Sequence, residues 1–257
     1  DLLYLVTKKH VENLREQEKQ LQEYVQKIKQ EFRNSIQSAV EKESLSSSAG
    51  EALHRIDDVP VVMVDRFQNM LAETNAQHFD KGFITVSSEF VSPERQLELK
   101  HILFHEFFHA ISGRSITLGT KASEGQSVTQ SYDKKVGVRL RVKENYALYT
   151  WLNEAITERF AVQYSGYQKN VLGAYESSDF YVQERKELDR LIRLGLEEEL
   201  ITAAYFENFT SDQPKKEKGV HFARLIKRIE EIEGKGGMGR IENKFVLQEV
   251  LSHIPRN

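Results

Sequence analysis

The chain has 257 residues, a net charge of −3 at pH 7 and no cysteine. This length is enough for one large domain or two small ones with a real core, and the charge gives no electrostatic case for binding nucleic acid. Disulfides, cysteine-ligated zinc and a cysteine nucleophile are excluded, so a bound metal needs His, Asp or Glu ligands. No run reaches the roughly 18 apolar residues of a membrane span.

The first residue is Asp1, and the apolar run at residues 2–6 is too short to be assigned as a targeting segment. Because the chain does not start with Met, we expect that something upstream has been removed or left out. This favours a soluble secreted or cell-surface protein slightly over a cytoplasmic one. The compartment itself stays open.

Residues 8–43 contain neither Gly nor Pro, and their apolar residues alternate three and four apart. This spacing predicts one long amphipathic helix with a narrow apolar seam, whose phase slips at Ile36. The seam consists of Val11, Leu14, Leu21, Val25, Ile28 and Phe32. The helix is expected to pack on its own domain, to form a homo-oligomeric coiled coil, or to belong to a pro-segment over residues 1–50. Residues 44–50 read as a linker, and residues 51–257 form the main domain.

Two short strands are predicted next, at residues 60–65 and 82–87, with a helix at 66–75 and a turn at 80–82. A longer helix is predicted at about 93–112. Ser92 is its expected N-cap, Pro93 takes the first helical position, and Gly113 is placed to stop it.

Residues 113–145 are rich in Gly, Ser and Thr and predict an insertion, in which 128–132 pairs with 136–142 around Asp133 and Lys134. A second strong helix follows at 149–167. Residues 168–257 then predict a helical C-terminal subdomain, with helices near 178–194, 196–209, 216–233 and 241–253. The fold class is therefore α+β and mostly helical, with one small sheet.

The helix at 93–112 carries the sequence His105-Glu106-Phe107-Phe108-His109, an HExxH motif. Histidines four apart on a helix share one face and can bind one metal ion, while Glu106 can take a proton from a metal-activated water. The alternative is a pair of hydrogen-bonded core histidines. His101, one turn earlier, is expected to support the site or lie at the surface rather than to bind the metal.

A catalytic zinc site needs a third protein ligand. The Gly and His that a metzincin places three and six residues after the motif are replaced here by Ser112 and Ser115. The helix at 149–167 carries Glu154 and Glu158 one turn apart, beside apolar residues. Burial of two carboxylates is costly without partners, and a metal for Glu154 and a histidine N–H for Glu158 would satisfy both.

These two helices resemble the gluzincin metallopeptidases, the thermolysin-like clan, in which HExxH is followed by Asn-Glu-x-x-Ser/Thr-Asp/Glu. The second motif is matched by Asn153, Glu154, Thr157 and Glu158. The resemblance implies a zincin-like catalytic domain with one Zn²⁺ bound by His105, His109 and Glu154. It further implies that Glu106 is the general base, that Asn153 and Glu158 support the ligands with Glu158 orienting His105, and that the strand at 82–87 is a sheet edge that receives substrate.

The chain departs from the clan in one respect, because Glu154 lies 45 residues after His109, closer to the spacing of the anthrax lethal factor branch than to that of thermolysin. The expected function is zinc-dependent hydrolysis of peptide or protein substrates, with an endopeptidase favoured. The alternative is a non-catalytic zincin-fold module that acts through the N-terminal helix. Candidates for the donor that stabilises the transition-state oxyanion are Tyr146, Tyr149, Tyr175, Tyr181 and His221.

Overall fold

The computed structural model describes residues 2–64, 76–77, 83–123, 126–143, 146–166, 181–208 and 219–252. The described chain is mostly helical, with two small sheets. It divides into two compact units. The first comprises Asp1–Ser44, Gly50–Ile111 and Phe160–Val171, and the second comprises Leu45–Ala49, Ser112–Arg159 and Leu172–Asn257. The predicted helix at 66–75 and the turn at 80–82 lie outside the described residues, and the predicted boundary at residue 50 stays a prediction.

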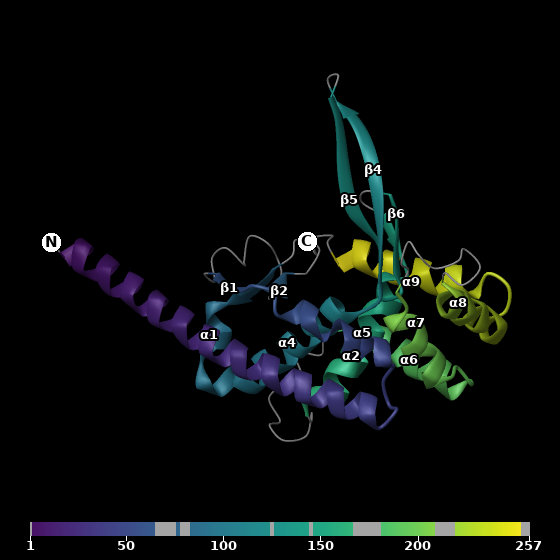
Figure 1. Ribbon diagram of the computed structural model, residues 1–257, viewed down its shortest axis with the longest axis horizontal. Helices are drawn as coiled ribbons and strands as arrows, with labels where there is room; N and C mark the ends of the chain where they lie inside the picture. Colours follow the sequence, from purple (N-terminus) through teal and green to yellow (C-terminus); the bar gives the residue numbers. More distant parts are fainter. Residues whose placement is uncertain are drawn as a thin grey trace. The chain divides into compact units, whose positions relative to one another are not determined.

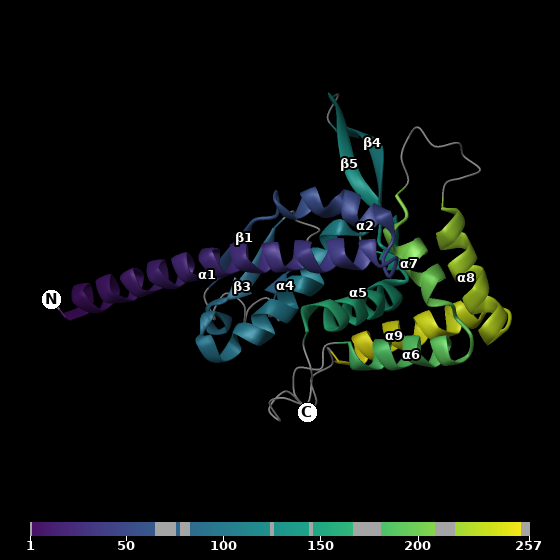
Figure 2. The ribbon, with the colours of Figure 1, turned by 60° about the horizontal axis from the view of Figure 1, so that its bottom comes forward.

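The long N-terminal helix is confirmed as α1 (Leu2–Glu41), and its apolar seam packs within the first unit (Figures 1 and 2). Seam residues from Leu21 onward are buried, and Ile36, where the alternation of three and four shifts, is buried with them. Phe32 lies at the centre of this contact, with its ring 5.1 to 5.5 Å from the rings of three phenylalanines on a later helix, Phe104, Phe107 and Phe108. Apolar burial of this kind gives α1 its main stabilisation.

Polar contacts fix the register of α1. Lys29 is buried and its Nζ donates to the carbonyls of Asp57 (3.3 Å) and Val59 (3.0 Å). These carbonyls follow a short 3₁₀ helix, η1 (Ala52–Ile56). Burial, followed by the nearby Arg33, lowers the pKa of Lys29. The segment at 44–50, predicted as a linker, contains the short helix α2 (Ser47–Glu51).

The sheet of the first unit has the order β1-β3-β2. β1 (Val61–Val64) and β3 (Ile84–Ser87) match the two predicted strands and pair in parallel, while β2 (Ala76–Gln77) pairs antiparallel with β3. The expectation that the strand at 82–87 is a sheet edge is wrong, because β3 is central and has a neighbour on each side. The two-residue β2, too short to read from sequence, covers that edge.

The HExxH motif lies on α4 (Gln96–Ile111), which follows two 3₁₀ turns, η3 (Ser88–Val91) and η4 (Pro93–Arg95). Ser92 and Pro93 begin η4 as predicted, although the Ser92 side chain makes no capping hydrogen bond. Thirteen of the sixteen residues of α4 are buried, so this is a core helix rather than an amphipathic surface helix.

The second unit contains a sheet of order β4-β5-β6-β7, with bounds Arg114–Ser123, Gln126–Val136, Arg139–Lys143 and Tyr146–Leu148. The predicted turn at Asp133 and Lys134 is wrong. Both residues lie inside β5, which pairs along its length with β4 to form a long hairpin (Figure 1). The turn to β6 falls at Gly137 and Val138, where Gly137 adopts a φ of +58°.

The predicted helix at 149–167 is α5 (Thr150–Ser165), and the predicted C-terminal helices are α6 (Val182–Arg193), α7 (Glu198–Phe206), α8 (Val220–Glu233) and α9 (Gly237–Ser252). Buried Glu242 of α9 holds the start of α5, because both of its oxygens accept from the Tyr149 N–H at 3.1 Å. Burial raises the pKa of Glu242, and the hydrogen bond from Tyr149 opposes that rise.

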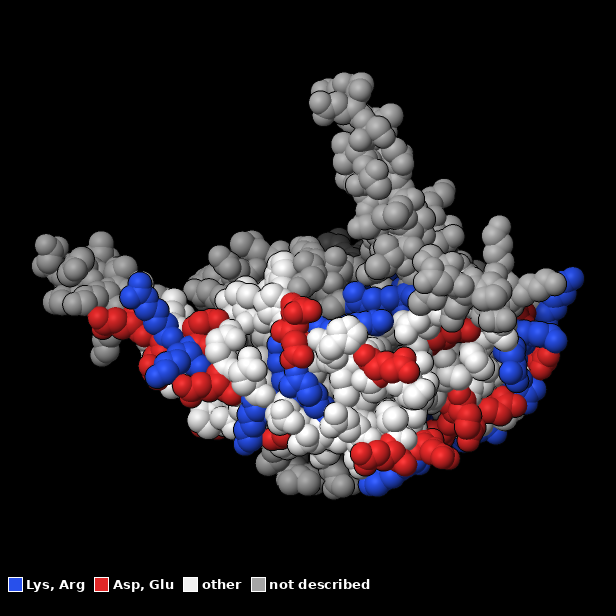
Figure 3. Space-filling model, viewed as in Figure 1, with Lys and Arg blue, Asp and Glu red and all other residues white. Residues whose placement is uncertain are grey.

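Acidic and basic side chains are interspersed on the described part of the face in Figure 3. Partly exposed ion pairs occur in each unit, such as Arg159 with Asp189 (2.9 Å) and Glu198 (3.0 Å) in the second unit. Pairs of this kind contribute under about 1 kcal/mol each, so the core and the buried hydrogen bonds decide the stability of each unit. None of the helices in the described residues combines the length and apolar character that crossing a membrane requires.

Candidate metal centre

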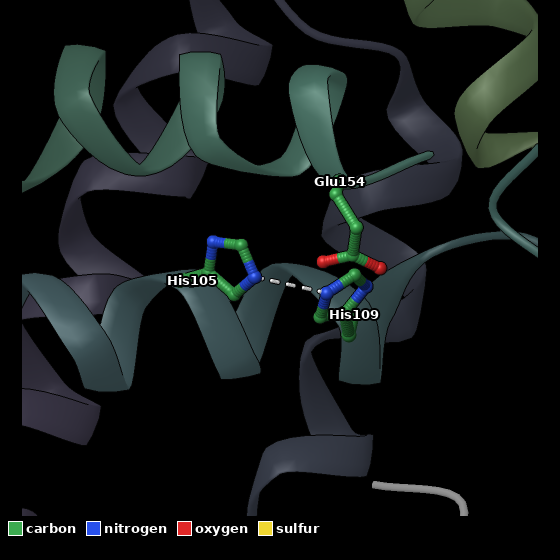
Figure 4. Close-up of side chains that lie close together, drawn as sticks. All are labelled: His105, His109 and Glu154. Carbon is green, nitrogen blue, oxygen red and sulfur yellow. Dashed lines mark hydrogen bonds between the residues drawn. The ribbon is translucent and has the colours of Figure 1, made fainter. Parts of the chain in front are cut away.

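The two histidines of the motif face one another on α4, as their spacing predicts. Nε2 of His105 and Nε2 of His109 lie 3.1 Å apart, and the ring centroids are 4.8 Å apart with the planes at 76° (Figure 4). Without a metal, this approach requires one Nε2 to carry a proton and the other to accept it. With a metal, both lone pairs point to the ion. The same geometry therefore serves either a histidine pair or a chelate.

Glu154 of α5 completes a group of three buried residues that could hold a metal ion. His105, His109 and Glu154 each offer one ligand atom, and these atoms lie within 4.8 Å of one another (Figure 4). Two nitrogens bound to tetrahedral zinc at about 2.0–2.1 Å lie roughly 3.3 Å apart, close to the separation of the two imidazoles. Two nitrogens and one oxygen form a donor set that suits zinc.

Glu106, between the two histidines in the chain, is also buried. Its Oε2 atom has no hydrogen-bond partner among the described residues. A buried carboxylate oxygen without a partner is costly to the fold. The orphaned oxygen lies on the residue that follows His105 in the chain.

Asn153, predicted to support the ligands, is fixed by buried hydrogen bonds. Its Oδ1 accepts from the backbone N–H of Val138 at 3.1 Å, and its carbonyl accepts from the Thr157 hydroxyl at 2.8 Å. Its Nδ2 donates to Oε1 of Glu154 over 3.4 Å. The residue before the candidate metal ligand is therefore held at its side chain and its backbone.

Glu158 and His101 are both buried. An oxygen of Glu158 lies 4.0 Å from Nη1 of Arg185, and the expectation that Glu158 orients His105 stays a prediction. The group of described residues that could hold a metal does not include His101, and its expected supporting role stays a prediction.

The oxyanion candidates lie in different places. Tyr149 has a φ of +62°, and its ring centroid lies 5.8 Å from that of Phe222. Tyr181 is exposed at the start of α6. His221 lines a groove between α7 and α8. Tyr175 and the side chain of Tyr146 lie outside the described residues. The choice among these donors stays a prediction.

Sequence reasoning missed the residues that hold Asn153. Gly137 and Val138 form the β5–β6 turn, and Tyr205 of α7 has its hydroxyl 2.7 Å from that of Thr157. The one signal in the sequence was a Gly in a Ser- and Thr-rich segment, which does not separate a turn from a close backbone contact. The Tyr205 contact joins residues 48 apart and leaves no local pattern.

No family model, curated protein or solved structure matches the chain. The metal-holding geometry therefore stands on the residues themselves, and membership of the gluzincin clan stays a resemblance of two motifs.

Proposed function

We propose that the chain is a zinc-dependent peptidase with a zincin-like catalytic domain of the gluzincin type, which hydrolyses internal peptide bonds. The observation that carries the proposal is the buried group of His105, His109 and Glu154 together with the unpartnered Oε2 of Glu106. A site that only stabilised the fold would have no use for a buried carboxylate oxygen left without a partner.

Each residue has a distinct task in the proposed reaction. Zinc bound by the two histidines and Glu154 would supply Lewis-acid activation of water and of the scissile carbonyl. Glu106 takes one proton from the water as the water oxygen bonds to the carbonyl carbon. The C–N bond then breaks, and Glu106 delivers that proton to the leaving amine.

The alternative, a non-catalytic module that acts through the N-terminal helix, has less support. From Leu21 onward the apolar seam of α1 is buried within the first unit and is not free for a partner. Val11, nearer the start of the helix, is 40% exposed, so a homo-oligomer contact there stays a prediction.

The function is tested with Glu106→Gln, which keeps the shape of the side chain and removes its basicity. We expect the variant to bind one zinc ion per chain and to cleave a diverse fluorogenic peptide library at least about 10²-fold more slowly than the wild type. Glu94→Gln, an exposed residue of η4, is the matched control and should keep full activity. A Glu106→Gln variant as active as the wild type, or a zinc-loaded wild type that cleaves no peptide, would contradict the proposal.

A further inference from the structure

A closed ring of buried hydrogen bonds in the second unit joins the base of the hairpin to α5 and α7. Gly113, just after α4, accepts from the N–H of Gly137 at 2.9 Å and donates its own N–H to the carbonyl of Tyr205 at 2.9 Å. The next residue after Gly137, Val138, donates its N–H to Oδ1 of Asn153 at 3.1 Å. The backbone of the hairpin base is thereby bonded to one helix on each side.

The ring closes through two hydroxyl groups. The Thr157 hydroxyl donates to the carbonyl of Asn153 at 2.8 Å, so its oxygen is left to accept from the Tyr205 hydroxyl at 2.7 Å. Thr157, Asn153 and Tyr205 are all at most 1% exposed. Every bond in the ring is thus shielded from competing water, which makes its geometry strongly preferred over any alternative.

Two glycines make these close approaches possible. A Cβ on Gly113 would lie 2.2 Å from the carbonyl oxygen of Glu207, and a Cβ on Gly137 would lie 2.2 Å from Oδ1 of Asn153 and 2.8 Å from the ring of Tyr205. Gly137 also has a φ of +58°, which other residues rarely adopt. The backbone at both positions is therefore in direct contact with the helices that the ring joins.

The ring determines which way the Asn153 amide faces. Because the Val138 N–H occupies Oδ1, the amide group of Asn153 must present its NH₂ on the other side, where Oε1 of Glu154 lies 3.4 Å away. A donor held in this way limits rotation of the Glu154 carboxylate. Partners that orient a ligand raise metal affinity because the ligand loses less freedom when the ion binds.

We propose that Tyr205 and the Gly137–Val138 turn are positioning residues for the metal ligand Glu154 and act through Asn153 and Thr157. The inference rests on the metal-binding part of the proposed function and not on peptide hydrolysis. In this proposal, the base of the β4–β5 hairpin holds α5, the helix that carries Glu154, in a fixed position.

The test compares the zinc dissociation constants of hydroxyl-deletion variants, measured by competition with a chelating dye on the full chain. Tyr205→Phe removes only the hydroxyl that bonds Thr157, and Thr157→Val removes the hydroxyl that joins Tyr205 to Asn153. We expect each to weaken zinc binding on the order of tenfold. Thr157→Ser, which keeps the hydroxyl, should restore wild-type affinity.

Tyr164→Phe is the matched control, because Tyr164 lies on the same helix and its hydroxyl is 3.5 Å from that of Ser44. It should leave the zinc affinity unchanged. The melting temperature of the metal-free chain is measured for every variant, since a purely structural role would lower it without changing the zinc affinity of the folded protein.

Zinc affinity unchanged within twofold in folded Tyr205→Phe and Thr157→Val overturns the proposal, and so does a wild-type chain that takes up no zinc. Peptide cleavage is assayed separately. If the zinc affinity of the chain depends on this ring but the chain cleaves no peptide, the positioning role stands. That outcome overturns only the proposal that the chain is a peptidase.

Discussion

The two helices that carry the metal-holding group are fixed by different kinds of contact. In the first unit, α4 is surrounded by apolar residues, with Phe32 of α1 against three of its phenylalanines. In the second unit, the start of α5 is held by buried hydrogen bonds and by glycine backbone in direct contact with side chains. Apolar packing tolerates small changes of shape, whereas close polar contacts are sensitive to the position of single atoms.

The largest loss of stability that this contrast predicts comes from a substitution at Gly137. Gly137→Ala should lower the free energy of unfolding by more than about 4 kcal/mol, because the new methyl group overlaps Oδ1 of Asn153 and the ring of Tyr205. The measurement is urea denaturation. Gly166→Ala is the control, since Gly166 has a similar φ of +70° but no described residue within 4 Å of an added Cβ. It should cost only the backbone strain of about 1–2 kcal/mol. Equal losses at both positions would show that the close contacts at Gly137 do not matter.

The next effect is a pH dependence of the free energy of unfolding that comes from the base of the hairpin. Lys135, at the base of the hairpin, is buried and donates to the carbonyls of Ala204 (3.3 Å) and Glu207 (2.9 Å). Burial lowers the pKa of Lys135 from 10.5 to about 7, and the charge of Glu207 opposes that shift. Between these two pH values the unfolded chain holds more protons than the folded chain, so the free energy of unfolding rises with pH.

Lys135→Met removes this titration. We expect the wild type to gain about 2 kcal/mol more than the variant between pH 7.5 and pH 9.5, measured by urea denaturation at both values. Lys186→Met, a substitution of an exposed lysine of α6, controls for loss of a charge. If the free energies of unfolding of the wild type and Lys135→Met changed equally with pH, Lys135 would keep its ordinary pKa in the folded chain.

The smallest predicted effect is in the apolar region. Phe32→Leu should lower the free energy of unfolding by about 1.5 kcal/mol, because a smaller apolar side chain still fills most of the space among the α4 phenylalanines. Its zinc dissociation constant should match that of the wild type. Phe32→Leu would then lower stability without changing zinc affinity, whereas Tyr205→Phe would weaken zinc binding. This difference would separate the apolar support of α4 from the polar support of α5. A large fall in zinc affinity for Phe32→Leu would remove the contrast.

The parts of the fold that follow local patterns could be predicted from the sequence. The periodicity of α1 and the start and stop signals of α4 predicted these helices, and the spacing of His105 and His109 predicted the facing imidazoles. The two carboxylates one turn apart on α5 pointed to Glu154. Patterns of this kind need only residues within a few turns of one another.

The parts that depend on distant contacts could not be predicted. Half of the residues of strand β4 are Ser, Thr or Gly, and its alternating apolar residues are only Ile116, Leu118 and Ala122. This signal is too weak to predict the ten-residue pairing with β5, and the Asp133-Lys134 pair indicates a turn instead. The central position of β3 depends on the two-residue β2. Which glycine is obligatory at the hairpin base is decided by the backbone of α7 and the side chain of Asn153, far along the chain.

The central claim is that His105, His109 and Glu154 hold one zinc ion, and zinc stoichiometry of the purified chain tests it most directly. After removal of metal with a chelator and titration with zinc, the wild type should bind one ion per chain, and His105→Asn should lose this site. His101→Asn, the same change one turn earlier on α4, should keep it. A wild type that binds no zinc, or a His105→Asn variant that still binds one ion with wild-type affinity, would contradict the account.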